Sequence, residues 1–300
     1  MRETSNARLT RLLELAIGSL TPPVGKRRII VAISYGIICH FIFLLAVISM
    51  MTAMFFGMSQ SLGGVPPPWN IAANLALILQ FPLAHSILLT KSGQIILSKL
   101  APSGYGATLA TTTFAIIASV QLLALFAFWT PSGTIWWQAQ GWPLAIISTL
   151  YALSWLLLIW ASFDAGAEVQ SGALGWMSLV QKIKPVFPDM PTQGLFKIIR
   201  QPIYVAFALT TWTVPIWTPD QLCLAIVLSA YCLLAPRLKE RRFSKRYGAR
   251  FADYKATTPY AFPKLSVFWK GRSSRLSVVI AHTARDKNAR VTAAIQRVFG

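Results

Sequence analysis

Residues 200–240 read RQPIYVAFALTTWTVPIWTPDQLCLAIVLSAYCLLAPRLKE and contain two apolar runs joined by a short break. The runs extend from 203 to about 217 and from 222 to 235, and Thr218-Pro219-Asp220 separates them. Proline and aspartate at such a break favour a tight turn, and the flanking runs favour helices. The stretch therefore predicts a helical hairpin that returns the chain to the face of the molecule where the hairpin began.

The rest of the chain has the composition of a membrane protein. Of its 300 residues, 55% are hydrophobic and 12% are charged, whereas soluble domains carry about 25% charge. Further uncharged runs are long enough to cross a bilayer. The sequence thus predicts an all-α polytopic membrane helix bundle of about six transmembrane helices with a C-terminal helical hairpin. The four earlier runs are Ile29–Phe56, about Trp69–Leu89, about Gly106–Trp129 and Trp142–Phe163.

Basic residues alternate across the predicted spans. The chain has 28 Lys and Arg against 9 Asp and Glu, a formal net charge of +19. Successive connections carry 6, 0, 2, 0, 4 and 0 basic residues, and the segment after the last span carries 16. The positive-inside rule then predicts that both termini are cytoplasmic. We expect this charge to meet anionic lipid at the cytoplasmic face and not nucleic acid, since no nucleic-acid-binding motif accompanies it.

We expect three regions along the chain. Residues 1–28 form a basic cytoplasmic segment, in which 8–20 (RLTRLLELAIGSL) has the spacing of an amphipathic helix lying along the membrane interface. Residues 29–263 form the membrane domain, and residues 264–300 form a basic cytoplasmic tail. Three scattered cysteines predict no disulfide framework, and three histidines without ligand spacing predict no metal site.

Polar residues concentrate where the predicted hairpin begins and ends. The fold-back brings Arg200 and Tyr204 to the same cytoplasmic mouth as Glu240. A cation, a tyrosine and a carboxylate suit a zwitterionic ligand with a cationic centre, because the ligand's carboxylate pairs with Arg and its amine or hydroxyls with Glu. The candidate site therefore lies at the open end of the hairpin.

Each of these residues also has an alternative explanation. The alternative for Arg200 is a membrane anchor, and for Glu240 it is a solvated ion pair with its basic neighbours. Tyr254 suits the headgroup interface. His85, in the second run, is either a buried hydrogen-bonded histidine or a substrate contact. Two acidic residues that follow the fourth run are expected to face water, namely Asp164 and Glu168.

The order of residues over 194–263 resembles a known family. The pattern is that of the isoprenylcysteine carboxyl methyltransferase and phospholipid methyltransferase superfamily, and with 82–86 (PLAHS) it is nearest the bacterial methanethiol S-methyltransferase and denitrification-associated branch. The resemblance covers roughly residues 70–263 and is specific from 194 onward. The residues that carry it are Gly194, Phe196, Arg200, Pro202, Tyr204, Glu240, Arg241, Phe243, Tyr247, Gly248, Phe251, Tyr254, Pro259 and Pro263.

The resemblance implies an integral-membrane methyltransferase of the bacterial inner (plasma) membrane, with residues 29–263 as its methyltransferase-like domain. It implies that S-adenosylmethionine binds from the cytoplasm and that a small or lipophilic thiol or carboxylate, or a lipid-linked substrate, accepts the methyl group. Methyl transfer from a sulfonium needs alignment and desolvation more than a strong acid. The implied roles are cofactor binding by Gly194, Arg200, Tyr204, Glu240 and Tyr254, catalysis by Arg200, Gln201 and Glu240, and substrate binding by His85.

One position departs from the family pattern. Gln201 stands where the family has histidine, and glutamine exchanges hydrogen bonds but cannot titrate. The alternative is therefore a non-catalytic membrane scaffold of the same fold that has lost the cofactor chemistry. A transporter is a third possibility, but none of the predicted spans contains a charged residue, and transporters usually place ionisable groups near the midplane.

Overall fold

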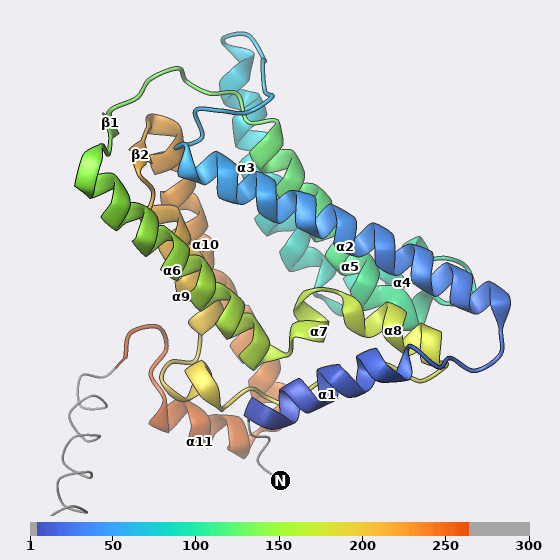
Figure 1. Ribbon diagram of the computed structural model, residues 1–300. Coiled ribbons are helices and arrows are strands. Elements are labelled where there is room, and N and C mark those ends of the chain that lie inside the picture. Colours follow the sequence, from blue (N-terminus) through green and yellow to red (C-terminus); the bar gives the residue numbers. More distant parts are fainter. Residues whose placement is uncertain (1–4, 264–300) are drawn as a thin grey trace, which may run out of the picture.

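The structure is a computed structural model that describes residues 5–263, and nearly all of its regular elements are helices (Figure 1). The basic tail predicted at 264–300 lies outside the described residues. In chain order the elements are α1 (Ser5–Gly18), α2 (Lys26–Phe55), α3 (Trp69–Leu88), α4 (Lys91–Leu100), α5 (Gly106–Ala127), β1 (Trp137–Gln138), α6 (Gly141–Ala165), α7 (Ala167–Gln170), α8 (Ala173–Gln181), the 3₁₀ helix η1 (Gly194–Lys197), α9 (Pro202–Trp212), β2 (Ile216–Trp217), α10 (Pro219–Tyr247) and α11 (Ala249–Thr257).

Five helices in the described part of the chain, α2, α3, α5, α6 and α10, are long and apolar enough to cross a membrane. This confirms the predicted all-α polytopic membrane bundle. The remaining predicted run forms α9, which is apolar but has only 11 residues. At about 1.5 Å per residue α9 reaches roughly half of the ~30 Å hydrocarbon core, so it spans only part of the bilayer.

The predicted hairpin is present, with arms of unequal length. Pro202 occupies the first turn of α9, where its missing N–H costs little, and the Thr218 hydroxyl caps α10 by accepting the N–H of Gln221 at 2.9 Å. The second arm does not stop at residue 235 as expected, because α10 continues through Pro236 to residue 247. Pro236 removes one backbone hydrogen bond of this helix, and beyond it Glu240 is held by hydrogen bonds from Arg200 and Gln201.

The main apolar core lies where α2, α3, α5, α6 and α10 meet. Met54, Phe126, Trp155 and Leu228 are buried there, and the Tyr151 hydroxyl donates to the carbonyl of residue 51 at 2.8 Å. Each of these helices keeps many large apolar side chains exposed on its other faces. Exposed apolar side chains along helices of spanning length are the surface that lipid covers.

The two ends of the bundle differ in composition. At one end, at the upper left of Figure 1, β1 pairs antiparallel with β2 through Trp137–Trp217 and Gln138–Ile216; we call this the aromatic end. At the other end, along the bottom of Figure 1, lie α1, η1, α11 and the last turns of α10; we call this the basic end. The open end of the hairpin, and with it the candidate site, belongs to the basic end.

Candidate functional site

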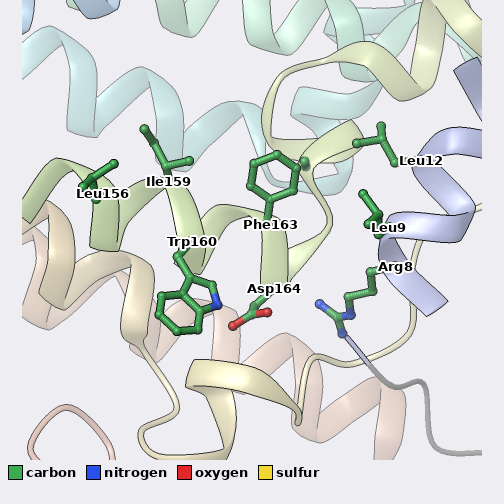
Figure 2. A pocket seen from close by; sticks show the side chains of 9 residues that line it. Arg8, Leu9, Leu12, Leu156, Ile159, Trp160, Phe163 and Asp164 are labelled. Carbon is green, nitrogen blue, oxygen red and sulfur yellow. The ribbon is translucent and has the colours of Figure 1, made fainter. Parts of the chain in front are cut away.

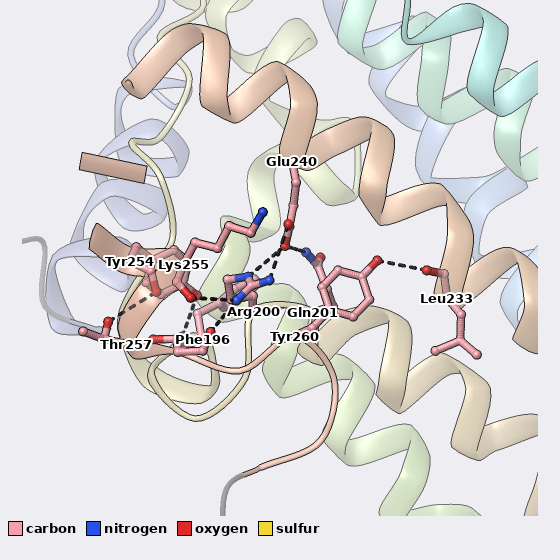
Figure 3. A network of polar contacts seen from close by, with 10 residues as sticks. Phe196, Arg200, Gln201, Leu233, Glu240, Tyr254, Lys255, Thr257 and Tyr260 are labelled. Atoms are coloured by element: carbon pink, nitrogen blue, oxygen red, sulfur yellow. Dashed lines mark hydrogen bonds and ion pairs between the residues drawn. The ribbon is translucent and has the colours of Figure 1, made fainter. Parts of the chain in front are cut away.

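Arg200 and Glu240 meet at the basic end. The Arg200 Nε donates to Glu240 Oε1 at 2.8 Å, and its second amino group lies 3.5 Å from Oε2 (Figure 3). Their side chains are only 8% and 12% exposed. A pair this buried is neither a membrane anchor nor a solvated surface pair, so these two alternative explanations do not describe the structure.

Gln201 completes the contacts to the same carboxylate. Its Nε2 donates to Glu240 Oε1 at 2.9 Å, and the residue is only 2% exposed. The other amide atom, Oε1 of Gln201, is buried and has no hydrogen-bond partner within residues 5–263. An unsatisfied buried acceptor costs free energy, so this oxygen is an unused hydrogen-bond acceptor at the site.

A late segment of the chain closes over the site. The backbone N–H groups of Arg200 and Gln201 donate to the carbonyls of Pro259 (2.9 Å) and Tyr260 (3.1 Å). The Arg200 guanidinium also donates to the carbonyls of residues 255 and 258. Contacts from both backbone and side chain therefore fix the position of Arg200 beside Glu240.

Tyr254 reaches the site from α11. Its hydroxyl donates to the carbonyl of Phe196 in η1 at 2.6 Å, as Figure 3 shows. Burial raises the pKa of the Tyr254 hydroxyl above its ordinary value, Arg200 lowers it, and Glu240 raises it again. The neutral hydroxyl of Tyr254 thus links α11 to η1 through a hydrogen bond, and Tyr254 lines the cavity described next.

These residues line one small cavity. Its free volume is about 10 Å³, close to the space that one water molecule needs. A nucleoside-sized ligand needs several hundred Å³, so side chains must move before such a ligand enters. The lining residues are Pro191, Phe196, Arg200, Gln201, Lys239, Glu240, Phe243, Phe251 and Tyr254.

Gly194 shapes the approach to this cavity. Its φ of +59° lies in the left-handed region, and a Cβ added there would come within 2.1 Å of Asp164 Oδ2. That same oxygen accepts the N–H of Leu195 at 2.8 Å. Glycine is therefore required at this position to seat η1 on the end of α6.

Both acidic residues expected to face water are buried, so that expectation was wrong. Asp164 is 4% exposed and Glu168 is 2% exposed. Asp164 accepts a hydrogen bond from the backbone N–H of Leu195 in η1, and Glu168 forms an ion pair with Arg11 of α1 at 3.2 Å. The prediction failed because the partners come from segments far away in the sequence.

A second cavity, of about 390 Å³, lies between α1 and α6 (Figure 2). Arg8 and Asp164 stand at its polar end, and Figure 2 shows both side chains directed into the same space. Its other walls are apolar. They are Leu9, Leu12, Leu156, Ile159, Trp160, Phe163 and Ala167.

His85 lies apart from the Arg200 cavity. Its ring packs among Phe81, Phe114 and Tyr231, with centroids 5.2, 4.8 and 6.4 Å away. Its Nδ1 is buried without a hydrogen-bond partner in the described part of the chain. The structure thus places His85 in an aromatic cluster of α3, α5 and α10, and its predicted contact with substrate stays a prediction.

The sequence analysis missed two residues that line the site, Pro191 and Lys239. Lys239 lines the cavity, and its ammonium lies near the rings of Phe196, Tyr204 and Phe243. Of these, Phe243 stands four residues further along α10, a spacing that places both side chains on one helix face. The other two rings come from η1 and α9, so only the folded chain brings all three together.

The fold and the site together define a class of protein. The chain is a polytopic helical membrane protein whose terminal hairpin buries an arginine, a glutamine and a glutamate around one cavity.

The comparisons with known proteins make that class more specific. The chain is 26% identical over 203 residues to a methanethiol S-methyltransferase of Pseudomonas deceptionensis, covering 67% of this chain and 76% of that protein. It is 26% identical over 237 residues to a methanethiol S-methyltransferase of Crocosphaera subtropica, covering 76% of this chain and 90% of the relative. Nurim of Rattus norvegicus is 27% identical over 182 residues, or 57% of this chain and 67% of nurim.

These relatives confirm the resemblance to the isoprenylcysteine carboxyl methyltransferase-like superfamily and to its bacterial methanethiol branch. They support a membrane protein with methyl transfer activity. No protein-family model and no solved structure matches the chain.

Proposed function

We propose that this protein is an S-adenosylmethionine-dependent methyltransferase of the bacterial inner membrane, whose acceptor is a small or lipophilic thiol or carboxylate. One observation carries the proposal. In a chain similar to methanethiol S-methyltransferases, Arg200, Gln201 and Glu240 converge on one buried cavity at the basic end. By the positive-inside rule that end faces the cytoplasm, where the cofactor is made available.

The residues present fit this cofactor. S-adenosylmethionine supplies an electrophilic methyl group on a sulfonium, together with an amino acid moiety and a nucleoside. Arg200 would pair with its carboxylate, and Glu240 would accept hydrogen bonds from its amine or hydroxyls. The unpartnered Oε1 of Gln201 offers one further acceptor, which a ligand amine or hydroxyl would satisfy.

The chain's own groups contribute alignment and exclusion of water. The buried rings of Phe196 and Phe251 and the half-buried ring of Phe243 line the cavity and lower its polarity, which favours a displacement that disperses positive charge. Gln201 takes no proton, so it is not the base. We therefore expect a thiol acceptor to react as its thiolate, and the rate of transfer to rise with pH as the thiol ionises.

The larger cavity supports a lipophilic acceptor. Its walls on α6 include Leu156 and Trp160, which are 60% and 59% exposed on the outside of the bundle. Asp164 lines this cavity and also binds Leu195, the neighbour of Phe196 in the small cavity. An apolar acceptor arriving from the bilayer would therefore reach η1 beside the candidate site.

Two measurements test the proposal. Equilibrium dialysis of the purified full chain in detergent against methyl-labelled S-adenosylmethionine should show saturable binding, and the scaffold alternative expects none. Membranes incubated with the labelled cofactor should then transfer label to an added small thiol, and the volatile fraction should carry it. Label in the lipid or protein fraction instead would show that the acceptor is a lipid or the terminus of a protein.

The predicted orientation is tested separately. A reporter enzyme that is active only outside the cytoplasm, fused after residue 263, should be inactive. The same reporter inserted at Gly133, in the connection at the aromatic end, should be active. The opposite pattern would contradict the proposed orientation of the candidate site.

A further inference from the structure

Lys239 occupies a cage of three aromatic rings. Its Nζ lies 5.7 Å from the ring centroid of Phe196, 5.5 Å from that of Tyr204 and 5.7 Å from that of Phe243. The rings come from η1, α9 and α10, so the cage exists only in the folded hairpin. Within residues 5–263, every other lysine or arginine found over an aromatic ring contacts one ring.

Such a cage is chemically suited to a cationic centre of a ligand. Aromatic faces attract cations within about 6 Å, and the attraction grows when the site is dry. Rings arranged around one point are how proteins recognise methylated ammonium groups. A sulfonium carries the same charge and is likewise surrounded by carbon substituents, so it is recognised by the same chemistry.

The charges around the cavity show why Lys239 and a sulfonium cannot share the cage. Arg200 and Glu240 form an ion pair and largely cancel each other. Lys239 is then the uncompensated charge among the residues that line the cavity, and it is positive. Two like charges a few ångströms apart in a poorly solvated site repel each other far more strongly than the thermal energy.

We propose that the Lys239 ammonium is an internal occupant of the cationic subsite, and that a sulfonium ligand binds only after this side chain has left the cage. The inference rests on the proposed function, and it explains why the small cavity is nearly filled. The flexible four-carbon stem of Lys239, beyond Pro236 on α10, allows the ammonium to swing out toward water or lipid headgroups.

The proposal makes Lys239 a specificity-determining residue for cofactor against product. S-adenosylhomocysteine, the demethylated product, has a neutral thioether in place of the sulfonium. It gains less from an empty cage and is repelled less by an ammonium that remains nearby. The wild-type chain should therefore favour the product over the cofactor more strongly than a chain without the lysine charge does.

The test measures dissociation constants of S-adenosylmethionine and S-adenosylhomocysteine on the purified full chain in detergent. Lys239→Met should bind S-adenosylmethionine at least about tenfold more tightly than wild type, and S-adenosylhomocysteine with a smaller gain. Lys239→Arg, which keeps the charge, should resemble wild type. Lys245→Met, which removes an exposed lysine of the same helix, is the matched control and should change neither constant.

The outcomes separate this inference from the proposed function. If wild type binds S-adenosylmethionine but Lys239→Met binds it equally or more weakly, the proposal that Lys239 occupies the cationic subsite is refuted. The methyltransferase proposal then still stands. If neither wild type nor any variant binds either ligand, both proposals fail. Lys239→Gln repeats the test with a polar neutral side chain, so a folding defect in the methionine variant does not leave the question open.

Discussion

Asp220 at the aromatic end and Glu240 at the basic end both accept several hydrogen bonds, but their surroundings differ. At the aromatic end Asp220 accepts from Trp129 Nε1 at 3.0 Å and from the backbone N–H of Ser132 at 2.9 Å, which fixes a loop onto the start of α10. At the basic end Glu240 accepts from Arg200 and Gln201 beside a cavity. Neutral donors and a fixed loop indicate a structural carboxylate, whereas a charged partner, an unpartnered amide oxygen and a cavity indicate a binding site.

Replacing the carboxylate at the basic end should have the largest effect on function. Glu240→Gln removes the charge that a ligand amine or hydroxyl requires, so we expect S-adenosylmethionine affinity and methyl transfer to fall by about tenfold to hundredfold. Arg241→Gln, which changes the exposed neighbour, is the control. Normal binding by Glu240→Gln, measured by equilibrium dialysis, would make Glu240 a purely structural partner of Arg200.

The equivalent change at the aromatic end should affect stability instead. Asp220→Asn weakens the bonds to Trp129 and Ser132, and we expect a loss of about 2 kcal/mol in the free energy of unfolding. Thermal unfolding in detergent measures it. The affinity of the surviving folded protein for S-adenosylmethionine should not change, and a parallel loss of affinity would show that the two ends are coupled.

Two glycines sharpen the comparison further. Gly194 and Gly133 both have positive φ, +59° and +74°, so an alanine at either costs about 1 kcal/mol of backbone strain. Only Gly194 also places the new Cβ against Asp164, since nothing lies within 4 Å at Gly133. Gly194→Ala should therefore lower the melting temperature more than Gly133→Ala does. Equal shifts would mean that η1 moves away from α6 at no cost.

The smallest effect is expected at the position that departs from the family pattern. Gln201→His keeps a ring nitrogen able to donate to Glu240, so methyl transfer should stay the same or rise. The rate of product formation at saturating cofactor measures it. Loss of activity would show that this chain requires an amide at position 201. It would favour a specific role for the unpartnered Oε1 of Gln201.

The sequence predicted the parts of the fold that depend on local pattern. The run predicted at 142–163 lies within α6, and the fold-back of residues 200–240 is present because a turn between two apolar runs leaves few alternatives. The break predicted at 218–220 is instead the beginning of α10, because Thr218 caps the helix and Pro219 and Asp220 form its first turn. The length of α10 beyond Pro236 was not predicted, because the contacts of Glu240 in that part of the helix come from residues 200 and 201 and not from the local pattern.

The site was predictable only in part. Its polar residues lie on the two arms of one hairpin, so topology alone placed Arg200 near Glu240. The cage around Lys239 and the burial of Asp164 depend on partners from separate segments, which no spacing rule connects. Whether the predicted residues bind cofactor or substrate stays a prediction until ligands are measured.

The carbonyls of Pro259 and Tyr260, which close over residues 200 and 201, give the protein a fixed order of assembly during translation. All five long helices are synthesised before residues 259 and 260 leave the ribosome, and these two residues are the last part of the site to be added. A chain that ended at residue 257 would therefore contain all five long helices and still lack a finished cavity. Binding competence should begin only when synthesis has passed that point.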